Sequence, residues 1–168
     1  MGFGDLQRMR YPVNVLTTRY YYTGKIEPFG PTLIWLNNLE RTAFPLLEFS
    51  GAALEGGSAI DTFTRDEFHL LKTDVVAVDL PTAEARETVS LLQRGVPVML
   101  YTERFVFKAT LPTSAEARLG ELLDAARGGF FAVTQAQIFP VRPARAQVFR
   151  TSEMLLVNRL HVTGYHAA

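Results

Sequence analysis

The sequence predicts an α+β fold made of two similar small units, each with a strand-strand-helix-strand-strand-strand order (β-β-α-β-β-β). Three observations support this prediction. A segment of the first half recurs in the second, runs of β-branched and aromatic residues lie at matching places, and each half carries a helical pattern after its second run. We expect each unit to be a curled antiparallel sheet or a partly open barrel capped by a helix, with the two units packed on each other.

The repeat is clearest over residues 11–22, which align with residues 96–107 without a gap. Four residue types recur at the same places: Pro12 and Pro97, Val13 and Val98, Thr17 and Thr102, Arg19 and Arg104. With one extra loop residue in the second copy, Leu33, Leu36, Arg41 and Phe44 align with Leu119, Leu122, Arg127 and Phe130. The original offset then returns, and Leu70 and Leu71 align with Leu155 and Leu156. Because self-similarity over a whole unit is the mark of a repeat, we interpret the chain as a tandem duplication.

In the first unit, residues 1–80, the pattern predicts a hairpin of Val13–Thr17 and Tyr20–Glu27, closed by a two-residue turn. A helix follows, with Pro31 at its first position and Leu33, Leu36 and Leu39 as its apolar stripe. Three further strands are predicted over 45–54, 62–71 and 74–80, with a loop at Gly56, Gly57 and Ser58.

Residues 81–95 form the predicted connector. Thr82 is a suitable N-cap for a helix that contains Val89, Leu91 and Leu92, and Gly95 is a suitable residue to end it. We therefore expect a structured connection between the two units.

In the second unit, residues 96–168, Glu103 and Arg104 occupy the hairpin turn. Thr113 and Glu116 have capping-box spacing ahead of a helix that Gly128 and Gly129 would end. The helix would bury Leu119, Leu122, Leu123 and Ala126. Strands are predicted over 130–139, 147–156 and 159–164, with a loop at Arg142, Pro143 and Ala144.

Composition places the chain among globular proteins. Hydrophobic residues make up 48% and charged residues 20% of 168 residues, which is enough apolar surface for a sizeable core. Cysteine is absent, which excludes disulfides, thiolate metal sites and cysteine nucleophiles. The chain has no apolar leader and no run long enough to span a membrane, so we expect a cytoplasmic protein without membrane contact and without a cofactor.

Aromatic residues of the first hairpin point to a core rather than to base stacking. Tyr20 and Tyr22 share one strand face, and their counterparts Phe105 and Phe107 have no polar tip. The opposite face is also apolar, which predicts that another surface covers the hairpin. The candidate contact residues are Tyr21, Val106, Val13 and Val98, with Val15 and Leu100 beside them. We expect a non-catalytic protein-interaction or assembly module that binds protein, including itself.

Charge is divided unequally between the halves. Up to Ala85 there are 7 Lys and Arg against 11 Asp and Glu, and afterwards 10 against 6. Opposite charges favour pairing of the halves, within one molecule or head to tail between molecules. The alternative is an anion or nucleic-acid patch of Arg142, Arg145, Arg150 and Arg159, which would bind single-stranded RNA.

Asp66, Glu67 and His69 form the densest group of titratable residues, and they are the candidates if the protein is an enzyme of unrecognised type. On a strand, Asp66 and His69 project to opposite faces, and the aligned residues of the second unit are Thr151 and Met154. We expect His161 and His166 to be exposed or to have single hydrogen-bond partners, and not to be metal ligands. We therefore expect neither catalysis nor a metal site.

Two resemblances accompany these patterns. The stretch from Gly24 to Phe29 and on to Asn37 resembles the first motif of Sm-like RNA-binding proteins, which implies base-pocket roles for Phe29 and Asn37. The acidic residue that follows the aromatic in that motif is Gly30 here, and the second unit lacks the motif. Nearly the whole chain resembles a tandem pair of a small bacterial β-rich domain, a resemblance that implies no catalytic residues.

Overall fold

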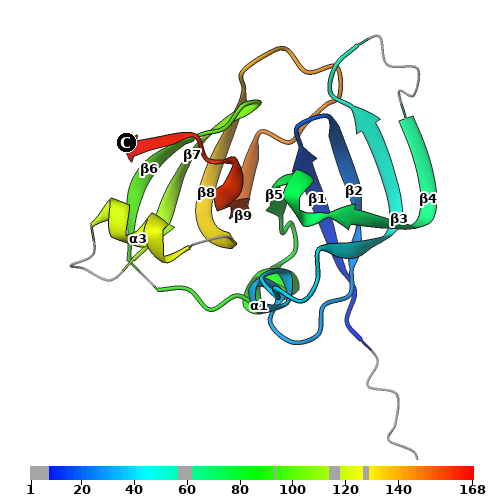
Figure 1. Cartoon of the computed structure of the whole chain (residues 1–168), viewed down its shortest axis with the longest axis horizontal. Coiled ribbons are helices and arrows are strands. Elements are labelled where there is room, and N and C mark those ends of the chain that lie inside the picture. Colours follow the sequence, from blue (N-terminus) through cyan, green and yellow to red (C-terminus); the bar gives the residue numbers. More distant parts are fainter. Residues whose placement is uncertain (1–7, 57–61, 93, 114–117, 127–128) are drawn as a thin grey trace, which may run out of the picture.

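One antiparallel sheet of ten strands organises the described part of the chain, which comprises residues 8–56, 62–92, 94–113, 118–126 and 129–168 of the computed structural model (Figure 1). The strand order is β10-β6-β7-β8-β9-β5-β1-β2-β3-β4, and each neighbouring pair is antiparallel. The fold is therefore mostly β, with short helices and an open sheet that ends at β10 and β4.

In the first half, a hairpin, a short helix and three more strands follow one another. They are β1 (Tyr11–Thr17), β2 (Tyr20–Ile26), α1 (Thr32–Leu36), β3 (Ala43–Ala53), β4 (Thr62–Leu71) and β5 (Val75–Asp79), with a 3₁₀ turn over Lys72–Asp74. After the connector helix α2 (Ala83–Glu87), the second half has β6 (Gly95–Tyr101), β7 (Phe105–Pro112), α3 (Leu119–Ala125), β8 (Phe130–Pro140), β9 (Thr151–Asn158) and β10 (Gly164–Ala167), with a 3₁₀ turn over Arg159–His161.

The strands of each half are arranged in the same way, as β5-β1-β2-β3-β4 and as β10-β6-β7-β8-β9. The halves are joined where β5 pairs with β9, with Ala77 opposite Val157 and Val78 opposite Leu156. In Figure 1 this junction lies at the centre, between a lobe containing β6, β7 and β8 and a lobe containing β1 to β4. The halves thus meet edge to edge in one continuous sheet.

Both hairpins turn through a threonine rather than through glycine or asparagine. The Thr17 hydroxyl donates to the Tyr20 carbonyl (2.9 Å) and accepts from the Tyr20 N–H (2.8 Å). Thr102 makes the same two bonds with Phe105, at 2.8 and 3.0 Å. These bonds satisfy the turn backbone, which explains how the predicted two-residue turns form without the usual turn residues.

A ladder irregularity recurs at the same place in each half. The register shifts within residues 23–25 of the β2–β3 pair and within residues 108–110 of the β7–β8 pair. Opposite each shift lies a residue in the left-handed region, Glu48 at φ 48° and Gln135 at φ 50°. Such φ values are uncommon outside glycine, and a bulge is the setting in which a sheet holds them.

Ladder positions also correct the predicted alignment of the halves. Ala43 lies opposite Leu71 as Phe130 lies opposite Asn158, so corresponding positions from β3 onward are 87 residues apart. Leu70 therefore corresponds in the ladder to Val157, and the predicted match of Leu70 and Leu71 with Leu155 and Leu156 is wrong by two residues.

Two hydrophobic clusters lie on the two sides of the central strands. Met154 and Leu156 of β9 belong to the cluster of the first half, whereas Leu155 and Val157 belong to that of the second half. All five residues of β5 are buried. Because side chains alternate across a strand, the sheet passes between the two cores and each core uses residues from both halves.

Several predicted elements differ from the structure. Thr82 caps α2 as predicted, accepting from the Ala85 N–H, but α2 ends at Glu87 and Gly95 begins β6. The stretch 147–150 precedes β9, and 159–164 is a 3₁₀ turn followed by the start of β10 rather than a strand. The predicted capping box of Thr113 and Glu116 is wrong, because α3 begins at Leu119 and the Glu121 carboxylate accepts from the Arg118 N–H. Glu116, Gly57, Ser58, Arg127 and Gly128 lie outside the described residues.

Among the described residues, no helix has the length and apolar character needed to cross a membrane.

Candidate protein-interaction site

β4 is a ten-residue strand at one end of the sheet. Its inner edge pairs with β3, and no strand among the described residues pairs with its outer edge. Most of its side chains are exposed: Thr62, Thr64, Arg65, Asp66, Glu67, His69 and Leu71. Its inner neighbour β3 contributes Pro45 opposite His69. Since proline has no N–H, this pairing is compatible with His69 directing its own backbone groups away from β3.

The other end of the sheet is β10, whose outer edge has no neighbouring strand in the described ranges. Its inner edge pairs with β6, and the Ala168 N–H donates to the Pro97 carbonyl at 3.0 Å. Backbone groups alternate in direction along a strand, so His166 and Gly164 also face β6 whereas Tyr165 and Ala167 face outward. The Tyr101 hydroxyl of β6 and the His166 Nε2 of β10 lie 2.9 Å apart, so a side-chain contact also joins these two strands.

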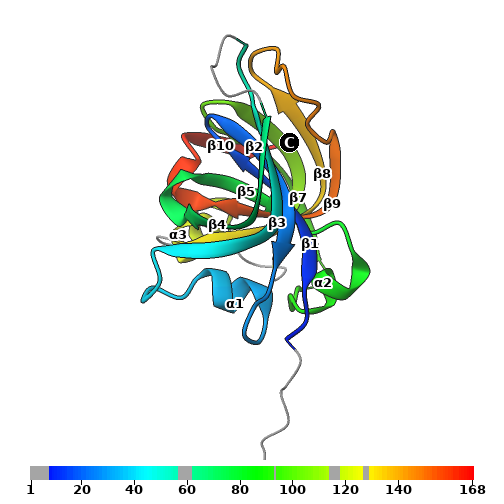
Figure 2. The same ribbon diagram turned by 90° about the vertical axis from the view of Figure 1, so that its right-hand side faces the viewer.

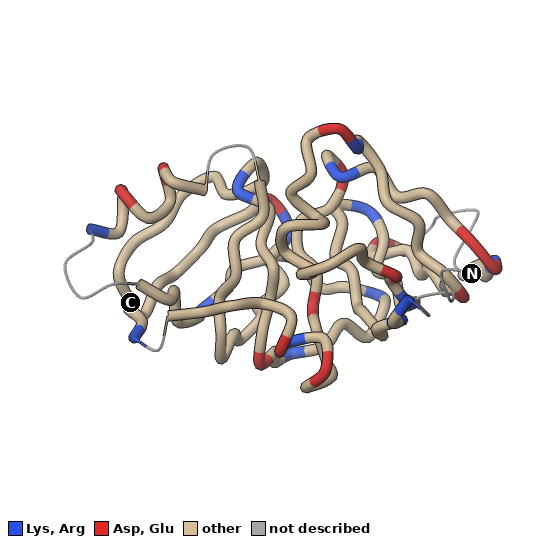
Figure 3. Tube along the Cα trace, turned by 90° about the horizontal axis from the view of Figure 1, so that it is seen from below, with Lys and Arg blue, Asp and Glu red and all other residues tan. Residues whose placement is uncertain are grey.

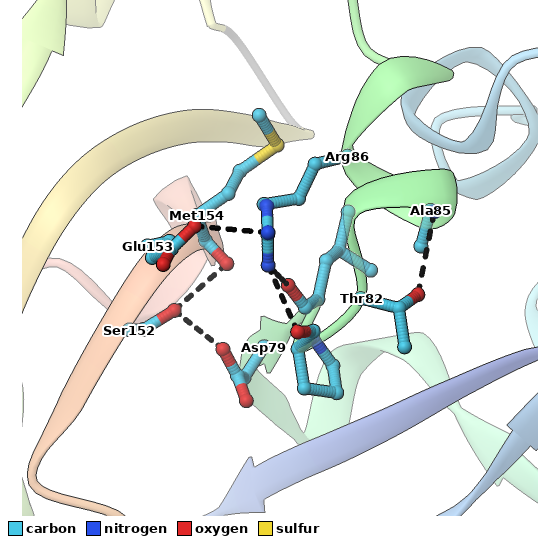
Figure 4. Close-up of polar contacts among 9 residues, drawn as sticks. Asp79, Thr82, Ala85, Arg86, Ser152, Glu153 and Met154 are labelled. Carbon is cyan, nitrogen blue, oxygen red and sulfur yellow. Dashed lines mark hydrogen bonds and ion pairs between the residues drawn. The ribbon is translucent and has the colours of Figure 1, made fainter.

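A buried polar network crosses the central junction (Figure 4). Asp79 of β5 is 4% exposed. It accepts from Asn14 Nδ2 of β1 at 2.8 Å, and its Oδ1 lies 2.5 Å from Ser152 Oγ of β9. The network therefore connects three adjacent strands, one of which belongs to the second half.

Burial raises the pKa of Asp79 above its ordinary value of 3.8, although hydrogen bonds from Ser152 and Asn14 and the charge of Arg86 act in the opposite direction. Proton counting favours the neutral acid. Ser152 Oγ also lies 2.8 Å from the Met154 carbonyl, and a serine hydroxyl has one proton to donate. If Asp79 donates to Ser152 and Ser152 donates to Met154, both contacts are hydrogen bonds.

Arg86 of α2 links the connector to residues at this junction. It donates to the carbonyls of Leu80 (3.2 Å) and Pro81 (2.9 Å) and pairs with the Glu153 carboxylate at 2.9 Å. The connector is thereby attached to β9 and to the two residues that follow β5.

The predicted contact residues are only partly accessible. Val13 and Val98 are 1% and 0% exposed and lie in the two cores, so their prediction as contact residues is wrong. Tyr21 and Val106 are half-buried. Tyr21 packs against Phe149, and its hydroxyl donates to Asn14 Oδ1 at 3.3 Å. The hairpin face is covered by the chain itself.

The predicted basic patch is divided. Arg142, Arg145 and Arg150 line one hollow of the loop that precedes β9, whereas Arg159 follows β9 at its opposite end. Arg142 lies 3.7 Å from Glu55, and Arg104 pairs with the same carboxylate. Figure 3 shows acidic and basic residues distributed along both halves. Ion pairs between the acidic and the basic half thus neutralise part of the charge of the predicted basic patch.

Asp66, Glu67 and His69 are exposed on β4. Glu67 and His69 share a face, and His69 Nε2 lies 3.0 Å from Glu67 Oε1. The part of the chain that the structure describes contains no group of three or more His, Cys, Asp or Glu suited to a metal ion. His161 contacts the Thr73 carbonyl, and His166 contacts Tyr101, so each histidine has its own partner.

Phe29 and Asn37, the residues implied by the Sm-like motif, line one open hollow beside α1, together with Leu33, Ile34 and Trp35. Asn37 Nδ2 donates to the Phe130 carbonyl (2.9 Å), and its Oδ1 accepts from the Phe130 N–H (2.7 Å). Its amide therefore ties the end of α1 to the start of β8. Phe29 is 57% exposed, with the Arg8 guanidinium 3.8 Å from its ring centre.

Sequence reasoning missed the two strand edges, because nothing in a strand's own pattern says which neighbours it will have. Comparisons with protein-family models, with curated proteins and with solved structures find no match to this chain.

Proposed function

We propose that this protein is a non-catalytic assembly module, which binds protein strands, including those of its own kind, at the ends of its sheet. The observation that carries this proposal is that, among the residues the structure describes, no strand pairs with the outer edges of β4 and β10. An open edge presents N–H and C=O groups that an added strand can satisfy, which is a common mode of protein recognition.

The rest of the exposed surface also favours protein as the partner. Large apolar side chains are exposed near α1 and after α2, namely Phe29, Ile34, Leu39 and Leu92. Figure 2 shows α1 and α2 at the same end of the molecule. Exposed apolar side chains gathered on one side are typical of protein contacts.

We infer further that the halves arose by duplication of one curled α+β unit. Three features support this inference: the shared strand order, the threonine turns and the paired irregularities at Glu48 and Gln135. A duplicated unit that binds its own copy is a simple origin for a self-assembling chain, because the contact between copies already exists inside one molecule.

Light scattering coupled to size exclusion tests the assembly function. The expected mass exceeds the 18.8 kDa of one chain and rises with protein concentration, with or without nuclease. A mass that stays at 18.8 kDa at every concentration, with no strand peptide bound, would exclude it.

Two variants of one edge residue sharpen this test. Glu67→Pro removes an N–H from the free edge of β4, whereas Glu67→Ala keeps it. The proline variant should reduce association at least about tenfold while the alanine variant associates like the parent. Equal effects of both variants would argue against strand addition at β4.

A second candidate function is single-stranded RNA binding, which the hollow lined by Arg142, Arg145 and Arg150 favours. Binding of a labelled oligonucleotide should weaken with salt and on replacing these arginines by alanine. Unchanged binding on these replacements would remove this candidate.

A further inference from the structure

We infer that β10 of one molecule pairs with β4 of a second copy, antiparallel and with Tyr165 opposite His69. This interface deepens the proposed assembly function and rests on it. The occupant of each free edge is then the other free edge of an identical chain.

The central junction supplies the template. In ladder position β5 corresponds to β10 and β9 corresponds to β4, each 87 residues apart. Inside the chain, Ala77, Val78 and Asp79 lie opposite Val157, Leu156 and Leu155. The same geometry between molecules places Gly164, Tyr165 and His166 opposite Leu70, His69 and Phe68.

Backbone directions are compatible with this register. The Leu80 N–H donates to the Met154 carbonyl at 3.1 Å, so Met154 and Leu156 direct their backbone groups toward β5. Their ladder counterparts on β4 are Glu67 and His69, which therefore direct theirs outward. On β10 the outward residues are Tyr165 and Ala167, as the bond from Ala168 to Pro97 requires. The proposed pairs thus bring free groups of one edge opposite free groups of the other.

The side chains make the outer contact more polar than the central one. Met154 and Leu156 are buried at the junction, whereas their counterparts Glu67 and His69 are exposed. A contact that contains these polar residues suits chains that also exist apart. The acidic first half would meet the basic second half of the next molecule, and such pairing weakens with salt.

Every molecule has one edge of each kind, so the contact is head to tail. Two molecules that exchange both edges close a dimer, and molecules that exchange one edge each form a longer chain. In both arrangements the residue pairs across the contact are the same.

The absence of cysteine makes disulfide trapping a direct test. Tyr165→Cys and His69→Cys are made separately at two exposed positions, mixed and oxidised mildly. In a hydrogen-bonded antiparallel pair the Cα atoms lie about 5.5 Å apart, within the range that a disulfide spans. The mixture should form a cross-linked species of two chains that reductant dissolves and that rises with concentration.

The register control mixes Tyr165→Cys with Glu67→Cys, which shifts the partner by two residues on the same face of β4. Such diagonal positions lie about 7 to 8 Å apart, so cross-linking should be at least about tenfold slower. Each single variant alone is the background, and circular dichroism confirms that all of them are folded.

The outcomes separate the two proposals. Equal or absent cross-linking in both mixtures, in a sample that light scattering shows to be associated, overturns this register and leaves strand-edge assembly standing. A sample that is monomeric throughout overturns both.

Discussion

At the scale of single residues, Asp79 couples protonation to folding. Because burial raises its pKa, the folded protein keeps this proton to a higher pH than the unfolded chain does. The free energy of unfolding contributed by this group therefore falls as the pH rises from about 4 through the raised pKa, and stays lower above it. Asp79→Asn should flatten this slope.

Urea unfolding at pH values between about 4 and 7 measures the slope. The control is Asp66→Asn, which removes a carboxyl group at an exposed position. An Asp79→Asn variant with the parent's slope would show that Asp79 does not retain its proton in the fold.

Thr102 is a second residue whose side-chain hydroxyl is expected to contribute to stability. Its buried hydroxyl closes the β6–β7 turn through two bonds with Phe105. Thr102→Val keeps the shape and removes both bonds, so we expect a loss of about 1 to 3 kcal/mol in the free energy of unfolding. Thr102→Ser should retain most of the stability, and equal losses in both variants would assign the effect to packing of the methyl group.

At the scale of elements, β3 approaches an aromatic cluster so closely that it needs a glycine. A Cβ at Gly51 would lie 2.8 Å from Phe63 and 2.8 Å from Tyr22. Phe63 itself packs edge-on against Phe49, with ring centres 5.4 Å apart, which limits how far it can move. Gly51→Ala should therefore destabilise the fold by about 1 to 3 kcal/mol.

Gly120 of α3 provides the contrast, since a Cβ there meets only the Tyr165 hydroxyl at 3.6 Å. Gly120→Ala should raise the stability by about 0.5 to 1 kcal/mol, because alanine favours a helix. Thermal unfolding of the two variants measures whether each change raises or lowers the stability of the fold. A neutral Gly51→Ala variant would mean that the aromatic cluster rearranges without cost.

Elements with local signals were predictable, and those set by distant partners were not. The range 62–71 matches β4, and both hairpins occur where alternation and turn position place them. The predicted match of Phe44 with Phe130 is off by one residue in the ladder. The alignment of Leu70 and Leu71 failed by two residues, because a two-residue shift keeps every side chain on the same face. Apolar alternation is equal in both registers, and the leucine doublets at 70–71 and 155–156 favoured the wrong one.

The candidate site was less accessible to sequence reasoning than the fold. Val13 and Val98 alternate as contact residues would, yet each is buried in the core of its own half. The identity of the edge strands depends on which strands pair over long distances. Only the arrangement of all ten strands reveals that β5 has a partner strand on both sides and that β10 has one on a single side.

At the scale of the whole molecule, the two cores depend on each other. The cluster of the first half includes Phe130, Ala132, Met154 and Leu156 from the second half. The cluster of the second half includes Leu16, Leu54, Val76 and Ala77 from the first. Neither half can bury its apolar surface without the other, so we expect one cooperative unfolding transition for the whole chain.

Two adjacent leucines of β9 test this sharing of cores. Leu155 and Leu156 are both 0% exposed, but they face the second and the first core respectively. Each change to alanine should cost about 2 to 5 kcal/mol, and each variant should still unfold in one transition. The native states should differ, because Trp35, the single tryptophan, lies in the first core.

Leu156→Ala should therefore alter the fluorescence of Trp35 and speed amide exchange in β1 and β2, although the residue belongs to the second half of the sequence. Leu155→Ala should instead speed exchange in β6 and β7 and leave Trp35 unchanged. These two variants are expected to differ because β9 lies between the two cores and its adjacent residues face opposite ones. If both variants changed the same half, or if the chain unfolded in two separate steps, the halves would be independent units that merely share an edge.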